Sequence, residues 1–94
     1  FDDWGLSVEK VTRAVARELK LSSGNGVRVI GIQPAFPAEN TGLRRGDIIS
    51  TVNRQPIESL QMLKDIYKGY EKSPDKILLE IWRHRKILYF VLKP

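Results

Sequence analysis

The 94-residue sequence predicts an α+β fold, formed by one domain that covers residues 1–94. Several short segments have the apolar pattern of strands, and two longer ones repeat apolar residues with the spacing of a helix. Gly, Pro and Ser separate these segments, with no linker or internal repeat among them. The 41% hydrophobic content suffices for a modest core. We expect about five strands, a long helix near each end of the order and a short helix between them.

The first part of the chain predicts a strand, a helix and a second strand. Residues 4–8 form a short apolar stretch, and residues 12–21 carry apolar side chains four apart, with Thr12 as the helix N-cap. Residues 22–26 supply the stop and a turn. Residues 27–32 are rich in β-branched side chains, which favours a strand.

The remaining elements follow in the same way. Residues 37–42 begin with Pro and end with Gly, which is typical of a one-turn helix. Residues 47–52 alternate as a strand does, and residues 59–70 form a helix with two apolar rows. Residues 77–82 and 87–92 flank a basic tetrapeptide as a hairpin. We expect Leu43, Ile48, Leu63 and Leu79 to be core residues.

The sequence does not predict a catalytic site or a metal site. The chain has no cysteine, which excludes a disulfide framework, a thiolate zinc site and a cysteine nucleophile. Its one histidine, His84, lies between two arginines at the predicted hairpin tip, so no catalytic triad can be built. We predict no catalytic residues, no metal ligands and no cofactor.

Charge and hydropathy limit the partners. Sixteen Lys and Arg against eleven Asp and Glu give +5, but the positive residues are spread from Lys10 to Lys93, with one cluster at residues 83–86. A scattered basic surface is typical of a solvated face, so we expect no nucleic-acid partner. No apolar run is long enough to span a bilayer. The chain starts at Phe1 and its single methionine is Met62, so we expect a piece excised from a larger protein.

One short segment has the pattern of an anion-binding loop. Gly5 allows the backbone to turn so that the amides of Trp4, Gly5 and Leu6 face one anion. Such a nest fits a carboxylate. The alternative is a plain tight turn at Gly5, with the Trp4 side chain capping the core.

A strand edge and a helix row extend this candidate site. The strand at residues 6–8 is expected to have an unpaired edge, where Ser7 and Val8 accept an extended peptide by main-chain hydrogen bonding. The second apolar row of the later helix, Met62 and Ile66, is expected to line the peptide groove. The alternative buries Met62 and Ile66 under the first helix.

Together these residues resemble the PDZ domains of the HtrA (DegP-like) bacterial serine proteases, over essentially the whole chain. The matching motifs are Asp3-Trp4-Gly5-Leu6, Pro34, Pro37-Ala38, Gly42-Leu43, Gly46-Asp47, Ile48-Ile49 and Asn53, with Arg83 in the closing hairpin. The resemblance implies a small five- to six-stranded, partly open β-barrel or sandwich capped by two helices. A peptide groove would lie between a strand and the second long helix.

The resemblance also implies a function. It predicts a module that recognises apolar C-terminal ends of peptides or unfolded proteins, attached to the protease domain of the same chain. The parent protein would be a homo-oligomeric serine endopeptidase of the periplasm. Two alternatives stay open: a structural domain with a degenerate groove, which holds subunits together, and a PDZ domain of another parent (a tail-specific protease, an intramembrane metalloprotease or a secretion component).

Three departures from the family pattern bear on this. Phe36 stands where relatives usually have Ser, which removes a helix cap and exposes an aromatic ring. Arg54 follows Asn53 where Gly is usual, which costs roughly 1 kcal/mol if Arg54 adopts a positive φ. Asp2 and Asp3 replace a basic residue before the loop, and we expect them to repel a peptide carboxylate.

Overall fold

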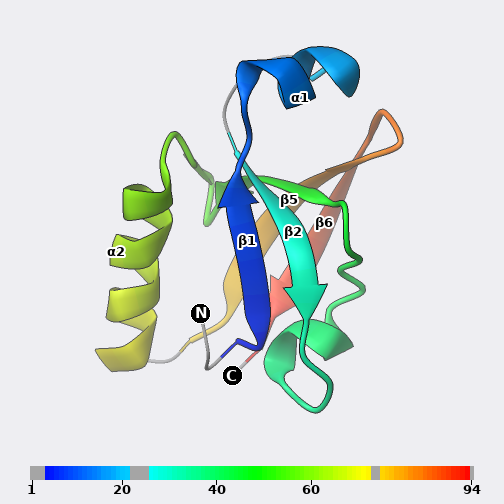
Figure 1. The fold of residues 1–94 in the computed structure, drawn as a ribbon. Coiled ribbons are helices and arrows are strands. Elements are labelled where there is room, and N and C mark those ends of the chain that lie inside the picture. Colours follow the sequence, from blue (N-terminus) through cyan, green and yellow to red (C-terminus); the bar gives the residue numbers. More distant parts are fainter. Residues whose placement is uncertain (1–3, 22–25, 73–74, 94) are drawn as a thin grey trace.

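The protein is an antiparallel sheet with two α-helices, as a computed structural model of residues 4–21, 26–72 and 75–93 shows (Figure 1). The elements are β1 (Leu6–Lys10), α1 (Arg13–Glu18), β2 (Val27–Ile32), the 3-10 helix η1 (Pro37–Asn40), β3 (Ile48–Val52), β4 (Gln55–Pro56), α2 (Leu60–Lys72), β5 (Ile77–Arg83) and β6 (Lys86–Leu92). The strand order is β1-β2-β3-β5-β6, and β4 pairs only with β3. The expected α+β class is confirmed, with six strands.

The first helix is shorter than the sequence predicts. Thr12 is its N-cap as expected, because its Oγ1 accepts a hydrogen bond of 3.1 Å from the N–H of Val15. The helix ends after six residues rather than continuing to residue 21. Lys20 has φ +56°, a left-handed conformation that terminates a helix. In the described part of the chain, α2, with 13 residues, is the one long helix.

The core lies between the sheet and α2, and a second cluster lies beneath α1. All four predicted core residues are buried, with exposed fractions of 6% or less. The second cluster consists of buried Val11, Ala16 and Ile48, against which half-buried Val15, Leu19, Leu21 and Trp82 pack. The apolar side chains that are four residues apart therefore attach α1 to the sheet.

An ion pair ties the loop before β3 to the end of β5. Asp47 is buried and accepts from Arg83 Nε at 2.7 Å, from Arg83 Nη2 at 2.6 Å and from the N–H of Arg44 at 2.8 Å. Arg83 Nη2 also donates to the carbonyl of Gly42 at 2.9 Å. The hydrogen bonds to Asp47 raise the pKa of Arg83 above its ordinary value, although burial acts to lower it. Two bonds to one carboxylate fix the guanidinium in place.

Two hairpin turns are formed by residues in the left-handed backbone conformation. Asn53 and Arg54 have φ +51° and +67°, and His84 and Arg85 have φ +48° and +63°. Type I′ hairpin turns of two residues need positive φ at both central positions, which Gly adopts at least cost. The strain expected at Arg54 is therefore present, and His84 lies at a hairpin tip as predicted.

Candidate functional site

Strand β1 has one free edge. Among the residues that the structure describes, it pairs with β2 alone, and α2 runs along its other side in Figure 1. The N–H of Gln33 donates to the carbonyl of Gly5 at 2.8 Å, and Leu6 lies opposite Ile32. Because main-chain groups alternate in direction along a strand, those of Leu6 and Val8 point away from β2, toward the free edge.

The turn before β1 directs its amides to this same side. The carbonyl of Trp4 accepts from the N–H of Ala38 at 2.9 Å, and the carbonyl of Gly5 accepts from Gln33. In a planar trans peptide the N–H that follows a carbonyl points in the opposite direction. The N–H groups of Gly5 and Leu6 therefore point away from the 33–38 segment, as a carboxylate nest requires.

Gly5 is required at this turn for two reasons. Its φ is +70°, and a Cβ there would lie 2.3 Å from Cβ and 2.9 Å from Cγ of Phe36. The half-buried Phe36 thus packs locally against the loop rather than projecting into solvent. As expected, it gives η1 no side-chain cap.

The side chains of Trp4 and Leu6 belong to the core, with exposed fractions of 1% and 5%. The indole of Trp4 meets the rings of Tyr67 and Tyr70 edge-on, with centroids 4.8 Å and 5.4 Å away. Trp4 does cap the core, as the alternative interpretation had it. What Trp4 and Leu6 can offer a ligand is main chain, whereas Ser7 is exposed on β1.

The structure places Ile66 on the edge of α2 that lies away from the Trp4 loop. Successive helix residues differ by 100°, so Ile66 and Tyr67 lie on opposite edges of the α2 face that buries Leu63. Tyr67 contacts Trp4, whereas Ile66 lines a hollow of about 240 Å³ with Asn53 and Ile77. Met62, one turn before Ile66, shares its edge.

The α2 edge beside the Trp4 loop therefore carries Leu60, Lys64 and Tyr67. The sequence pattern does not single out these three residues, because Leu60 and Tyr67 also fit the face that buries Leu63. Leu60 and Tyr67 are half-buried against the core, and Lys64 is exposed. Ser59 marks where the helix begins, because its Oγ accepts from the N–H of Met62 at 3.2 Å, but it does not distinguish the two edges of the helix.

Other expectations are tested only in part. The repulsion expected from Asp2 and Asp3 falls on residues outside those described. Within residues 4–21, 26–72 and 75–93, no group of three acidic, His or Cys side chains is placed to hold a metal ion. In the same part of the chain, no helix is long and apolar enough to cross a membrane.

Comparison with known proteins finds one matching domain family and several related proteins that share one name. The family described as PDZ domain matches residues 3–93. A probable periplasmic serine endoprotease DegP-like of Chlamydia pneumoniae is 29% identical over 91 residues, which cover 96% of this chain and 18% of that protein. The protein of the same name from Rhizobium meliloti (strain 1021) is 33% identical over 54 residues, 57% of this chain and 11% of that protein. The chain thus spans less than a fifth of either relative.

Solved structures share the fold. The HtrA3 PDZ domain bound to a phage-derived ligand (FGRWV) has a TM-score of 0.77 and 26% identity, covering 96% of this chain and 81% of that one. The PDZ domain of EpsC from Vibrio cholerae has a TM-score of 0.70 at 14% identity, covering 100% and 99% of the two chains. The second likeness shows the fold alone.

Proposed function

Because the chain belongs to the PDZ domain family, we propose that it binds the free C-terminal end of an extended polypeptide. The peptide adds as a strand to the free edge of β1, where the main-chain groups of Leu6 and Val8 point outward. Its carboxylate accepts hydrogen bonds from the amides of Trp4, Gly5 and Leu6. The observation that carries this proposal is the anchoring of the Trp4 and Gly5 carbonyls on the opposite side, which turns the N–H groups of Gly5 and Leu6 outward.

The apolar end of the peptide packs against the α2 edge that carries Leu60 and Tyr67. Main-chain pairing is blind to sequence, so these side chains supply the selectivity for apolar residues. Leu60→Ser and Met62→Ser form a matched pair, since both residues are half-buried in the first turn of α2 and lie on opposite edges. Leu60→Ser weakens peptide binding, whereas Met62→Ser leaves it within about twofold. If Met62→Ser weakened binding and Leu60→Ser did not, the groove would instead be lined by Met62 and Ile66.

The decisive experiment compares a peptide acid with its amide. The sequence FGRWV, the ligand of the HtrA3 domain, serves as the probe. Charge-assisted hydrogen bonds exceed neutral ones by about 1.5 kcal/mol, so calorimetry on the 94-residue domain should show the amide binding at least about tenfold more weakly. Equal affinities would refute carboxylate recognition and favour internal segments.

We further propose that the domain recognises substrates for an HtrA-like serine endopeptidase of the periplasm, with the protease domain in the same chain and a homo-oligomeric parent. The names of the DegP-like relatives support this assignment. In the full-length protein, adding the acid form of the probe should change the rate of cleavage of an unfolded substrate. An unchanged rate with bound peptide would contradict a regulatory role.

A second candidate is an assembly domain whose groove no longer accepts a ligand. The packing of Tyr67 and Tyr70 on Trp4 favours it, because aromatic rings fill space beside the carboxylate loop. In this case neither form of FGRWV binds, and deleting the domain changes the oligomeric state of the parent protein in light scattering.

A further inference from the structure

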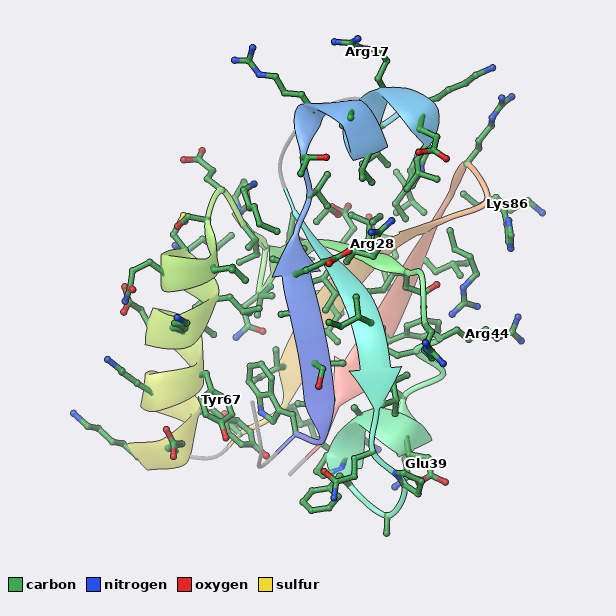
Figure 2. All side chains as sticks on the ribbon, viewed as in Figure 1. Arg17, Arg28, Glu39, Arg44, Tyr67 and Lys86 are labelled. Carbon is green, nitrogen blue, oxygen red and sulfur yellow. The ribbon has the colours of Figure 1, made fainter. Side chains whose placement is uncertain are left out.

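A small hollow lies at the end of the molecule away from α2. It has a volume of about 190 Å³ and is formed by the end of α1, the loop at residues 44–48 and the tip of the β5–β6 hairpin. Figure 2 shows Arg44 and Lys86 on this side of the molecule, opposite α2. Leu19 and Trp82 contribute an apolar wall.

The remaining wall is strongly basic. Arg44, Arg45, Arg83 and Arg85 line the hollow, and among the described residues Asp47 is the one carboxylate that does so. Four positive charges and one negative charge leave a surplus of three. In the sequence the basic residues are scattered, but folding brings together two arginine pairs that are about 40 residues apart. Like charges in one concavity repel unless an anion joins them.

Two of these arginines are already held in place. Arg83 uses Nε and Nη2 for Asp47 and Gly42, and its guanidinium lies 5.5 Å from the ring centroid of Phe90. Its Nη1 takes part in none of these bonds. Arg45 donates through Nε to the carbonyl of Ile30 at 3.1 Å, which leaves its terminal nitrogens for another acceptor. Fixed guanidinium groups lose little side-chain entropy when they bind an anion.

We propose that this hollow binds a phosphate group. A surplus of three charges suits an anion that carries more than one charge, and a carboxylate carries only one. Guanidinium forks match the paired oxygens of phosphate, and the apolar wall lowers the local dielectric and strengthens the attraction. The volume fits a single small anionic group rather than a polymer chain. The site does not involve the free edge of β1, so the proposal stands independently of peptide binding.

The test titrates the isotope-labelled domain with inorganic phosphate, and with sodium chloride at the same ionic strength. Amide shifts should saturate with phosphate only and should concentrate at residues 44–48 and 83–85. Arg44→Gln/Arg85→Gln removes two charges, and each lost charge-assisted bond is worth about 1.5 kcal/mol or more, so binding should weaken at least about tenfold. Glutamine keeps a side chain at Arg85, so the turn strain is unchanged.

Lys68→Gln/Lys72→Gln is the matched control, with the same charge change on exposed positions of α2. It should bind phosphate as the unmodified domain does. Equal weakening in both double variants, or shifts that chloride reproduces, would overturn the proposal in favour of general surface screening. If thermal melting shows that the arginine variant is unfolded, Arg45→Gln replaces it with the same expectation.

A second arm distinguishes the source of the phosphate group. Sedimentation with phosphatidylcholine vesicles, with and without phosphatidic acid, tests a lipid headgroup. Binding to the acidic vesicles that exceeds binding to free phosphate and is lost in Arg44→Gln/Arg85→Gln identifies a lipid. Saturable binding of free phosphate without vesicle binding identifies a soluble phosphorylated ligand. Binding to neither overturns the proposal.

Discussion

Replacing Gly5 by Ala tests whether the proposed carboxylate-binding loop needs glycine for the two reasons that the structure gives. The backbone there has φ +70°, and the added Cβ would stand 2.3 Å from Cβ of Phe36. The left-handed conformation costs an L residue roughly 1–2 kcal/mol. The overlap with Phe36 requires the loop or the η1 segment to shift, which costs about 1–3 kcal/mol as overpacking does.

Together these terms predict a loss of about 2–5 kcal/mol from the free energy of unfolding. A domain of this size is stable by roughly 5–15 kcal/mol, so Gly5→Ala should remain folded in the cold and melt well below the unmodified domain. Gly69→Ala is the control, because its Cβ would meet no atom within 4 Å. In an exposed helical position alanine should stabilise by about 0.5–1 kcal/mol.

A double-mutant cycle separates the two costs. Phe36→Gly removes the two nearest atoms that the new Cβ would strike and leaves the carbonyl oxygen of Gln33 at 3.3 Å. In that background Gly5→Ala should lose little more than the backbone part, about 1–2 kcal/mol. Urea denaturation of the four proteins gives the coupling energy directly. A coupling near zero would refute the steric argument, and Gly5→Ala without any loss would refute the left-handed turn as well.

Three further predictions concern the frame around the site. Asp47→Asn should cost about 3 kcal/mol in urea denaturation, because it leaves the guanidinium of Arg83 without its counter-charge; a loss below about 1 kcal/mol would contradict this. Arg54→Gly should stabilise by about 0.5–1 kcal/mol, measured by the same method, because φ +67° suits glycine; destabilisation would refute the strain. The hydrogen bond from Tyr89 to Glu80 raises the pKa of Tyr89 above its ordinary value, which means that it stabilises the folded protein while the phenol is protonated. This contribution to folding is present below about pH 10 and is lost as the pH rises through the raised pKa. Titration of the phenol by NMR should show a lower pKa in Glu80→Gln, and an unchanged pKa would refute the assignment.

The sequence predicts those elements of the fold whose limits are set by neighbouring residues. The strand at residues 27–32 and the β5–β6 hairpin coincide with their predicted ranges to within a residue, because β-branched runs and turn residues mark their ends. The early end of α1 was not predictable, since Lys20 is an ordinary helix former that takes a left-handed conformation only in the fold. The two-residue β4 is too short to leave any pattern.

The candidate sites also contain features that depend on neighbouring residues and features that depend on the whole fold. The turn at Gly5 could be predicted because its requirement is local: a glycine before a strand. Carboxylate binding by Trp4, Gly5 and Leu6 stays a prediction. The basic hollow could not, because its arginines come from two loops that only the sheet brings together.

The α2 edge that faces β1 shows why a periodic pattern leaves a site undecided. Both edges of the helix are apolar, with Leu60 and Tyr67 on one and Met62 and Ile66 on the other, on either side of Leu63. Periodicity identifies the buried centre, but it is equally satisfied by either edge facing β1. The choice is made by a distant contact, the packing of Tyr67 on Trp4. Trp4 also begins the loop that we propose to bind the carboxylate. Under this proposal, the residue that fixes the helix rotation also determines which side chains meet the peptide. A substitution at Trp4 should therefore alter selectivity as well as stability.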